Sequence, residues 1–353
     1  MKKVDCIIVG QGIAGTMLSW FLLQEGFSVL VIDDGKKNSA SRVAAGIINP
    51  VSGRRFEPAW MYDEIYPFAK TTYAELSALL KVNILTERNL WTVFPSEQLR
   101  DAFNAKAGKG SNEKYTTIPQ TLQYGEYLKQ PLGAAIIKGG TVNLKEFLPA
   151  YRQFLENKEA LLPVHFELDA LEIISHDEVR YGEYSAKRII FCDGAAGATN
   201  PYFQAIKFLP NKGEVLMIRI PGLETSDIIK KSITLVPQSE GVFWAGASFA
   251  WNYPDELPTP EQRAHLEEKI EQLLLVPYEV TDHLAAVRPS GDDRRPIVGF
   301  HPEYPALGVF NGLGTKGCSL APLMAAHFAK VIGNKEDLMA EIAVNRYFNR
   351  PRR

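Results

Sequence analysis

Cysteine is scarce in this chain of 353 residues. Its three cysteines, Cys6, Cys192 and Cys318, lie far apart and form no CxxC pair, which argues against a disulfide framework. This usage is typical of a reducing compartment and predicts a cytoplasmic protein. Only six histidines are present, and the chain contains no HExxH sequence, no paired histidines at metal-ligand spacing and no catalytic triad motif. The sequence therefore predicts no metal site.

Long apolar runs and a strong charge of one sign are also missing. No stretch of 18 uninterrupted apolar residues exists, so no transmembrane helix is expected. Lys2 and Lys3 before apolar residues resemble the start of a signal peptide, but Asp5 interrupts the segment, and its removal would delete a predicted strand. The formal net charge of -2 argues against nucleic acid, including tRNA, as the main partner.

Apolar residues make up 46% of the chain, and its length predicts two domains or one large domain with an insertion. Apolar spacing and capping residues predict helices over residues 13–26, 59–80, 143–157, 319–332 and from 259 onward. Strands are predicted over residues 4–9, 28–32, 186–192, 214–220, 232–236 and 242–247, with a further strand pair within 296–309 and short strands and turns within 81–138.

The first 34 residues contain a dinucleotide-binding pattern. The apolar run 4–9 leads into Gly10-Gln11-Gly12-Ile13-Ala14-Gly15, and the run 28–32 ends in Asp33-Asp34. In this order, Gly10 permits a tight turn, Gly12 lets the backbone approach a pyrophosphate at a helix N-terminus, and Gly15 lets that helix pack close to the strand. Asp33 lies 18 residues after Gly15 and is placed to bind an adenosine ribose. The pattern predicts an adenine dinucleotide but does not choose between FAD and NAD.

A second glycine-rich loop lies near the C-terminus. It reads Asn311-Gly312-Leu313-Gly314-Thr315-Lys316-Gly317 and enters the predicted helix 319–332. Such a loop makes a second place where backbone N–H groups and a helix dipole face an anion. An FAD molecule has two groups that need such a place: the pyrophosphate, and the N1/C2=O edge of the flavin, which gains negative charge on reduction. A nicotinamide ring has no group like the second. The loop favours FAD, and the alternative is an ordinary turn that starts a helix.

Both glycine loops belong to an ordered set of motifs along the chain. The other members are the segments 191–195, 233–237, 242–248, 287–289 and 295–299. This set resembles the FAD-dependent family that includes D-amino acid oxidase, and most closely its glycine oxidase and sarcosine oxidase branch. The stretch 312–322 also resembles the oxidase half of the bifunctional enzyme that makes 5-methylaminomethyl-2-thiouridine in tRNA. The resemblance covers nearly the whole chain.

The resemblance implies an α/β (α+β) fold. It consists of a discontinuous FAD-binding Rossmann-like domain of glutathione-reductase type and a second domain built on an antiparallel sheet. We expect residues 1–80, 139–206 and 284–353 in the FAD-binding domain, and residues 81–138 and 207–283 in the substrate domain. The residues expected to bind FAD are Gly10, Gly12, Ile13, Ala14, Gly15, Asp33, Asp34, Ser41, Arg42, Ala45, Gly46, Gly194, Gly312, Gly314, Thr315, Lys316 and Gly317.

The resemblance also implies catalytic roles for Arg288 and Lys316. An amine C–H would deliver hydride to flavin N5, the imine would hydrolyse, and a second acceptor, often oxygen, would reoxidise the flavin. Arg288 matches the family arginine that pairs with a substrate carboxylate, for which its planar fork is suited; the alternative is a solvated surface arginine. Lys316 matches the flavin-facing loop, where a cation would favour the reduced anion; the alternative is a lysine that points into water.

Thr234 and Thr315 depart from the glycine oxidase pattern, which has a carboxylate-binding tyrosine at the first position and an arginine at the second. Both changes argue against free glycine or a small amino acid as the substrate. Cys318 raises the question of a covalent flavin link, but a small buried apolar residue is the favoured interpretation. Aromatic residues in and after the strand 242–247 would either wall a pocket or fill a core. They are Trp244, Phe249, Trp251 and Tyr253.

We therefore predict an FAD-dependent oxidoreductase that oxidises a small carboxylate-bearing amine, either an N-substituted glycine or an amino acid. One alternative is an oxidase that removes the carboxymethyl group from a wobble-uridine side chain of tRNA. That side chain is itself an N-substituted glycine, so Arg288 would serve both reactions, but the chain shows no methyltransferase half and no basic platform for tRNA. Another alternative is a flavin-binding subunit of a larger dehydrogenase complex. The substrate, the electron acceptor and the oligomeric state stay open.

Overall fold

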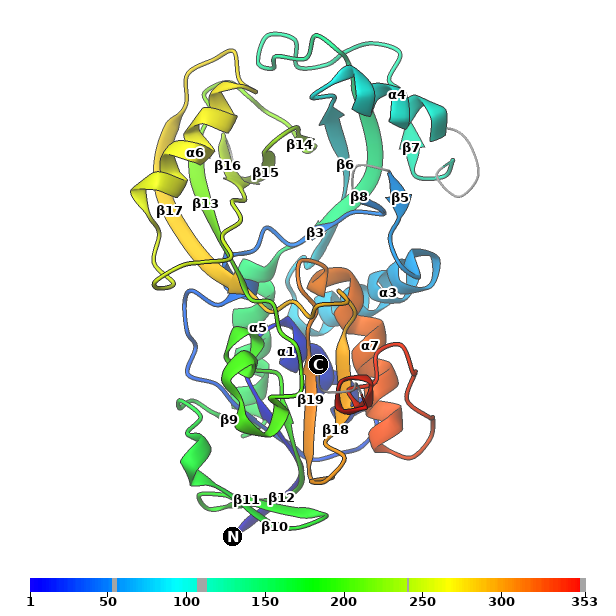
Figure 1. Ribbon diagram of the computed structural model, residues 1–353, viewed down its shortest axis with the longest axis vertical. Coiled ribbons are helices and arrows are strands. Elements are labelled where there is room, and N and C mark those ends of the chain that lie inside the picture. Colours follow the sequence, from blue (N-terminus) through cyan, green and yellow to red (C-terminus); the bar gives the residue numbers. More distant parts are fainter. Residues whose placement is uncertain (53–55, 107–112, 240, 350–353) are drawn as a thin grey trace.

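The computed structural model describes residues 1–52, 56–106, 113–239 and 241–349. They form two parts stacked along the long axis of the molecule, each built on its own sheet (Figure 1). The first sheet lies in the lower part of Figure 1, with the N-terminus at its lower end, and the second sheet lies in the upper part. A small separate hairpin pairs β4 (Val51–Ser52) with β5 (Glu57–Pro58).

The first sheet has a parallel centre with antiparallel additions. Its strands are β1 (Lys2–Val9), β2 (Val29–Ile32), β9 (Leu161–Leu162), β10 (Leu171–Ser175), β11 (Glu178–Tyr181), β12 (Tyr184–Phe191), β18 (Ile297–Phe300) and β19 (Leu307–Asn311). The strands β19, β12, β1, β2 and β9 are parallel neighbours in that order, whereas β10 with β11, and β18, join in antiparallel pairs. The central strands are apolar runs buried on both faces, as parallel sheets require.

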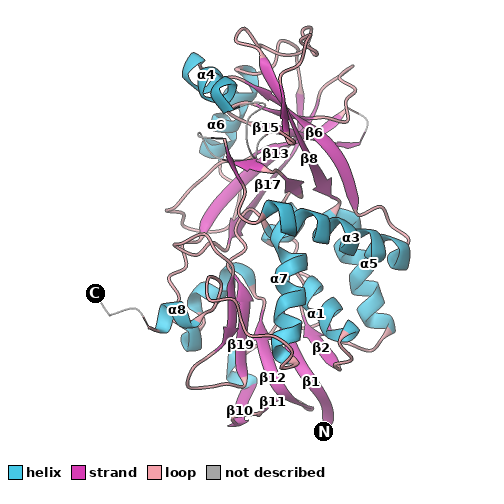
Figure 2. Cartoon of the chain, turned by 90° about the vertical axis from the view of Figure 1, so that its right-hand side faces the viewer, coloured by secondary structure: helices cyan, strands magenta, loops and turns pink. Residues whose placement is uncertain are grey.

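Helices α1 (Ile13–Gln24), α5 (Leu144–Asn157) and α7 (Gly317–Ile332) lie together against one face of this sheet (Figure 2). The long helix α3 (Tyr62–Leu80) packs across α7 and α5. Asn143 caps α5 as its sequence predicts, because its side chain accepts a hydrogen bond from the Glu146 N–H at 3.4 Å. Short helices α2 (Ala40–Val43) and α8 (Asn345–Phe348) and three 3₁₀ turns, Leu168–Ala170, Gly194–Thr199 and Pro201–Phe203, complete this part.

The second sheet is antiparallel except where β14 runs parallel to β6. Its strands are β3 (Ile47–Ile48), β6 (Leu85–Val93), β7 (Thr116–Thr117), β8 (Ala134–Val142), β13 (Asn211–Arg219), β14 (Ile228–Lys230), β15 (Thr234–Ser239), β16 (Val242–Gly246) and β17 (Glu279–Arg288). They are ordered β17-β13-β16-β15-β14-β6-β8-β3, with β7 added on β8. Helix α6 (Pro260–Glu271) packs on β13 and β16, and α4 (Glu97–Lys106) lies beside β7 at the other end of this part (Figure 1).

These two sheets confirm the predicted fold class. The predicted helices 13–26, 59–80, 143–157 and 319–332 are present within a few residues, but α4 and β14 were not expected. Helix α4 escaped prediction because it is short and mostly polar and buries only Phe103, so few apolar positions mark it in the sequence. Among the described residues, no helix is long and apolar enough to span a bilayer.

The expected domain junctions do not all coincide with strand ends. The junctions at 138/139 and 283/284 fall inside β8 and β17, and β3, which lies within the expected segment 1–80, joins the second sheet. These strands cross from one part of the molecule to the other. We keep the two-domain division as a proposal, with these junctions moved to the ends of β8 and β17 and with β3 assigned to the second domain.

Candidate functional site

A cavity of about 980 Å³ lies between the two parts of the molecule. The first part contributes the glycine turn after β1, the loops after β2 and β12, and the loop into α7. The second part contributes side chains of β13, β14, β15, β16 and β17. Because the cavity is at the upper end of the size range of ligand sites and is lined from both sheets, it is the candidate active site.

The glycine turn brings the N-terminus of α1 to the cavity. Gly10 has a φ of +97°, and a Cβ there would lie 2.7 Å from the Cys192 carbonyl oxygen. A Cβ at Gly15 would lie 1.9 Å from the Gly10 carbonyl oxygen, so this glycine permits the close packing of helix and strand. Gly12 is the N-cap and gives no side-chain cap, while the Ile13 N–H donates to Ser41 Oγ at 3.0 Å. The first N–H groups of α1 therefore face the cavity.

Asp33 lies at the cavity wall, where the end of β2 meets the glycine turn. Its carboxylate accepts hydrogen bonds from the Gln11 N–H and the Gly35 N–H, each at 2.8 Å, and forms an ion pair with Arg152 Nη1 at 2.8 Å. A carboxylate has about four acceptor positions, so these bonds leave capacity for a ribose hydroxyl. Arg152 could not be predicted as the partner of Asp33, because it lies 119 residues further along the chain, on α5.

The second glycine-rich loop is fixed by Asn311. Its amide donates to Asp193 Oδ1 and to the Gly194 carbonyl, both at 2.9 Å, while its oxygen accepts from the Gly312 N–H at 2.8 Å. Burial raises the pKa of the Asp193 carboxyl to about 7. Asp193 lines the same cavity. The loop is thereby tied to the loop after β12, and both reach the cavity.

Lys316 is the N-cap residue of α7 and lines the cavity. Its pKa is lowered, first by burial and then by the nearby Arg295 and Arg294. No ion pair or side-chain hydrogen bond of its ammonium group occurs among the described residues. The start of α7 therefore presents a lysine and free backbone N–H groups to the cavity, which favours an anion there.

Arg288 ends β17 and also lines the cavity. Its Nη1 donates to Asn211 Oδ1 at 2.7 Å, both Nη atoms reach the Ser248 carbonyl at 3.3–3.4 Å, and the Phe249 ring lies 4.5 Å from the guanidinium. A Cβ at Gly213 would lie 2.0 Å from Nη2, so this glycine makes room for the arginine. Burial lowers the pKa of Arg288 to about 10. Within the described part of the chain, no carboxylate pairs with it.

Arg288 and Lys316 come from distant segments that the backbone joins. The Gly314 N–H donates to the Pro289 carbonyl at 3.1 Å, and Ser290 forms an antiparallel bridge with Leu313. Two cations that the sequence separates by 28 positions therefore lie on one cavity wall.

The cavity brings together all but two of the residues predicted to act on or bind a cofactor. Gly15 and Gly312 do not line it, because one supports the packing of α1 and the other the turn after β19. Those that line it are Gly10, Gly12, Ile13, Ala14, Asp33, Asp34, Ser41, Arg42, Ala45, Gly46, Gly194, Arg288, Gly314, Thr315, Lys316 and Gly317. Their contacts with a cofactor stay predictions.

The flanking aromatic residues divide between the two interpretations. Trp244 is buried, lines the cavity and donates from Nε1 to the Val43 carbonyl at 2.9 Å. Phe249 and Trp251 are 64% and 61% exposed, so they do not fill a core, and of these two only Phe249 lines the cavity. Cys318 is buried, and burial raises its pKa to about 12, so it is a small apolar residue of the cavity wall.

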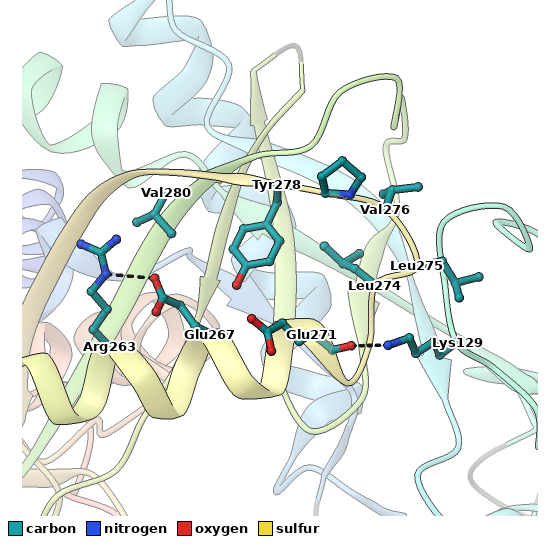
Figure 3. A pocket seen from close by; sticks show the side chains of 10 residues that line it. Lys129, Arg263, Glu267, Glu271, Leu274, Leu275, Val276, Tyr278 and Val280 are labelled. Carbon is teal, nitrogen blue, oxygen red and sulfur yellow. Dashed lines mark hydrogen bonds and ion pairs between the residues drawn. The ribbon is translucent and has the colours of Figure 1, made fainter.

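A second hollow, of about 600 Å³, lies on the far side of the second sheet between α6 and β17 (Figure 3). Three of its charged side chains have partners: Arg263 pairs with Glu267 at 2.9 Å, and Lys129 donates to the backbone carbonyl of Glu271 at 2.7 Å. None of the residues predicted to be functional lines it. Among the described residues, no group of histidine, cysteine and acidic side chains could hold a metal ion.

The fold and the site together define a class of proteins. Its features are a Rossmann-type sheet with a glycine turn and an antiparallel sheet, which share one cavity bordered by the N-termini of α1 and α7. Residues 5–331 match the family of FAD dependent oxidoreductases, and the chain belongs to this family. It is an FAD-dependent enzyme, as its sequence predicts.

Similar proteins include a curated glycine oxidase of Geobacillus kaustophilus (strain HTA426). It is 25% identical over 364 residues, which cover 95% of this chain and 94% of that protein. The crystal structure of glycine oxidase from Geobacillus kaustophilus superposes with a TM-score of 0.83 at 20% identity and covers 98% of this chain and 99% of the other. The iminodiacetate oxidase from Chelativorans sp. BNC1 has a TM-score of 0.78 at 19% identity and covers 97% and 98%. These two structures support the fold.

The cavity fits FAD in two respects. Apart from the Ile13 N–H, which donates to Ser41 Oγ, the first N–H groups of α1 have no side-chain cap and are open to a pyrophosphate. Gly12 has no side chain to block this approach, and a Cβ there would meet Ser41 Oγ at 3.0 Å. The uncapped N-terminus of α7 and Lys316 offer positive charge at a second place on the wall. A dinucleotide with an anionic group at each place satisfies both.

Proposed function

We propose that this protein oxidises a small amine that carries a carboxylate, and that its substrate is an N-substituted glycine rather than free glycine. Bound FAD would accept the hydride from the carbon next to the amine nitrogen. The nitrogen loses a proton, the resulting imine hydrolyses, and oxygen or another acceptor takes the two electrons from the cofactor.

The observation that carries the proposal is that Arg288 lies on the cavity wall without an acidic partner in the described structure. Its guanidinium is partly buried, and a substrate carboxylate would supply the missing charge. The planar fork of arginine forms two parallel bonds with a carboxylate, so it would fix the orientation of the substrate as well as its affinity. Asn211 and Ser248 hold the guanidinium from behind.

Two threonines on the cavity wall indicate that the substrate is larger than free glycine. Thr234 and Thr315 both line the cavity, where the resemblance to glycine oxidase implies a tyrosine and an arginine. Without those two larger groups, the wall leaves room for a substituent on the nitrogen. Relatives named as glycine oxidase and iminodiacetate oxidase support a glycine-type amine as the substrate class.

Anaerobic reduction of the flavin tests the proposal. Sarcosine, N-ethylglycine, proline, glycine and a nucleoside with a carboxymethylaminomethyl group would be compared in the wild-type protein and in Arg288→Ala. A buried pair that loses one partner costs about 2 to 5 kcal/mol, so we expect kcat/KM to fall roughly 30-fold or more, with the FAD content unchanged.

Faster reduction by amines without a carboxylate, or equal rates in the two proteins, would overturn the proposal. Reduction by the nucleoside alone would favour the tRNA-modifying oxidase. An FAD-loaded protein that no amine reduces would favour a flavin-binding subunit of a larger complex.

A further inference from the structure

Lys230 is a further cation on the cavity wall, and the proposed function does not use it. It is the last residue of β14, which lies between β15 and β6 in the second sheet (Figure 1). Side chains alternate along a strand, and Ile228, two residues earlier, packs on the same face as Val215 and Trp244, which also line the cavity. Lys230 therefore projects from the cavity face of the sheet.

The charges on that face are all positive. Among the described residues that β13 to β17 contribute to the cavity wall, only Lys230 and Arg288 are charged. No ion pair or side-chain hydrogen bond of the Lys230 ammonium occurs in the described structure, and burial lowers its pKa. An ammonium group that is withdrawn from water without a partner is unfavourable unless a ligand supplies the opposite charge.

The acidic residues of the cavity are engaged elsewhere. Asp33 pairs with Arg152, and Asp34 accepts from His165 Nδ1 at 2.9 Å. Glu256 pairs with Lys36 at 2.6 Å, and Asp193 accepts from the Asn311 amide. None of these carboxylates pairs with Lys230 in the described structure, so its ammonium group is left to bind an anion that enters the cavity.

The neighbouring Lys231 shows the contrast. Its ammonium donates to the Lys129 and Gln272 carbonyls, each at 3.1 Å, beside the C-terminal end of α6. It is absent from the cavity wall. The ammonium groups of these two consecutive lysines therefore differ in their hydrogen bonds: Lys231 has acceptors within the protein, and Lys230 has none in the described structure.

We propose that Lys230 binds a second carboxylate, carried by the N-substituent of the substrate, so that the enzyme prefers dicarboxylic amines of the N-(carboxyalkyl)glycine class. This inference rests on the proposed function, in which Arg288 binds the glycine carboxylate. β14 and β17 are four strand steps apart in the sheet, about 19 Å at the usual spacing. The strand register places Lys230 in line with Leu284 of β17, and Arg288 lies four residues further, about 13 Å along that strand. The two long side chains span part of this distance, so the longer diacids are the ones expected to reach both cations. A substrate with a carboxylate at each end would connect them.

The test compares acids of graded length with neutral counterparts of similar length. Iminodiacetate, N-(2-carboxyethyl)glycine and N-(3-carboxypropyl)glycine would be paired with N-ethylglycine, N-propylglycine and N-butylglycine in the FAD-loaded enzyme. We expect kcat/KM to be at least 10-fold higher for the best diacid than for its neutral counterpart. Lys230→Met should remove this preference by lowering the rate with the diacid while the neutral amine stays within 2-fold, and Lys230→Arg should restore part of it.

Lys231→Met is the matched control, since it removes the same charge one residue away, and it should keep the preference of the wild type. Equal losses for diacid and neutral amine in Lys230→Met, or no loss, would overturn the inference. So would a Lys230→Met protein that no longer retains FAD, because the ammonium group would then serve the cofactor.

A binding measurement separates this inference from the proposed function. Thioether analogues in which sulfur replaces the N–H, such as thiodiacetate and methylthioacetate, cannot react as amines and can be followed by their effect on the flavin absorption spectrum. We expect Lys230→Met to weaken binding of the best dicarboxylic thioether at least 10-fold and to leave the monocarboxylic one unchanged. This result would stand even if no amine reduced the flavin, and equal affinities in both proteins would refute it.

Discussion

We propose that Lys316 is the charged residue with the most direct effect on the reduction potential of a bound flavin. It is the N-cap residue of α7 at the cavity wall, and its pKa is lowered by burial and by two nearby arginines. The chain therefore holds an ammonium group in a place that is costly for a cation, next to a helix end that is already positive. Such an arrangement favours whatever negative charge the flavin acquires on reduction.

Replacing Lys316 with methionine should lower the flavin reduction potential. A charge beside a helix terminus is worth roughly 0.3 to 2 kcal/mol, which corresponds to roughly 6 to 40 mV for a two-electron couple. Sulfite binding, which also produces an anionic flavin, should weaken roughly 2- to 30-fold. Lys330→Met is the control, because Lys330 lies in the last turn of the same helix, paired with Glu336. An unchanged potential and sulfite affinity in Lys316→Met would mean that the side chain faces water.

Helix α6 is held to the second sheet by a buried charged group rather than by apolar contacts alone. Glu214 on β13 is fully buried and accepts hydrogen bonds from the Thr259 N–H and Oγ1 at 2.8 and 3.1 Å, at the N-terminus of α6. The same carboxylate pairs with the buried Lys212 at 3.1 Å and lies 2.9 Å from His283 Nε2. One side chain thus joins β13, β17 and α6.

Glu214→Ala should destabilise the protein by about 3 to 5 kcal/mol, because it leaves the Lys212 ammonium buried and unpaired. The free energy of unfolding, measured by urea titration of the FAD-free protein, checks this value. A double variant, Lys212→Met with Glu214→Leu, should recover most of the loss, since no buried charge remains. Glu183→Ala, which removes the exposed partner of Lys2, should cost less than about 1 kcal/mol. Equal losses of unfolding free energy in Glu214→Ala and Glu183→Ala would show that the buried carboxylate contributes no more to stability than the exposed one.

The elements that could be predicted from the sequence are those that depend only on residues close together in the chain. The glycine turn, the Asn143 cap and the Thr259-Pro260 start of α6 each depend on residues within a few positions, and each is present. The three residues of β14 carry too little periodicity to be recognised, and with them Lys230 was missed. Arg152, Asn211 and Asn311 were missed because their partners lie 119, 77 and 118 positions away, so that only the folded chain brings them together.

The molecule as a whole is two sheets that share one cavity, and a ligand in that cavity contacts both. The glycine turn, the loop into α7 and the strands β13 to β17 approach it from different parts of the chain. A cofactor that binds only the folded arrangement stabilises all of these segments together. The resistance of the protein to heat should therefore depend on the concentration of free FAD.

At 100 times its Kd, FAD should add about 2.7 kcal/mol to the stability. For a chain of 353 residues that unfolds cooperatively, this raises the Tm by about 4 °C. Gly12→Val should abolish the rise, because a side chain at that position occupies the space where the pyrophosphate approaches the backbone and already meets Ser41 Oγ at 3.0 Å. Gly125→Val is the matched control, since a Cβ there meets nothing within 4 Å, and its Tm should still rise with FAD.

NAD at the same concentration should leave the Tm of all three proteins unchanged. A rise of equal size in Gly12→Val would show that the glycine turn does not hold the pyrophosphate, and a rise with NAD alone would make the cavity a nicotinamide site.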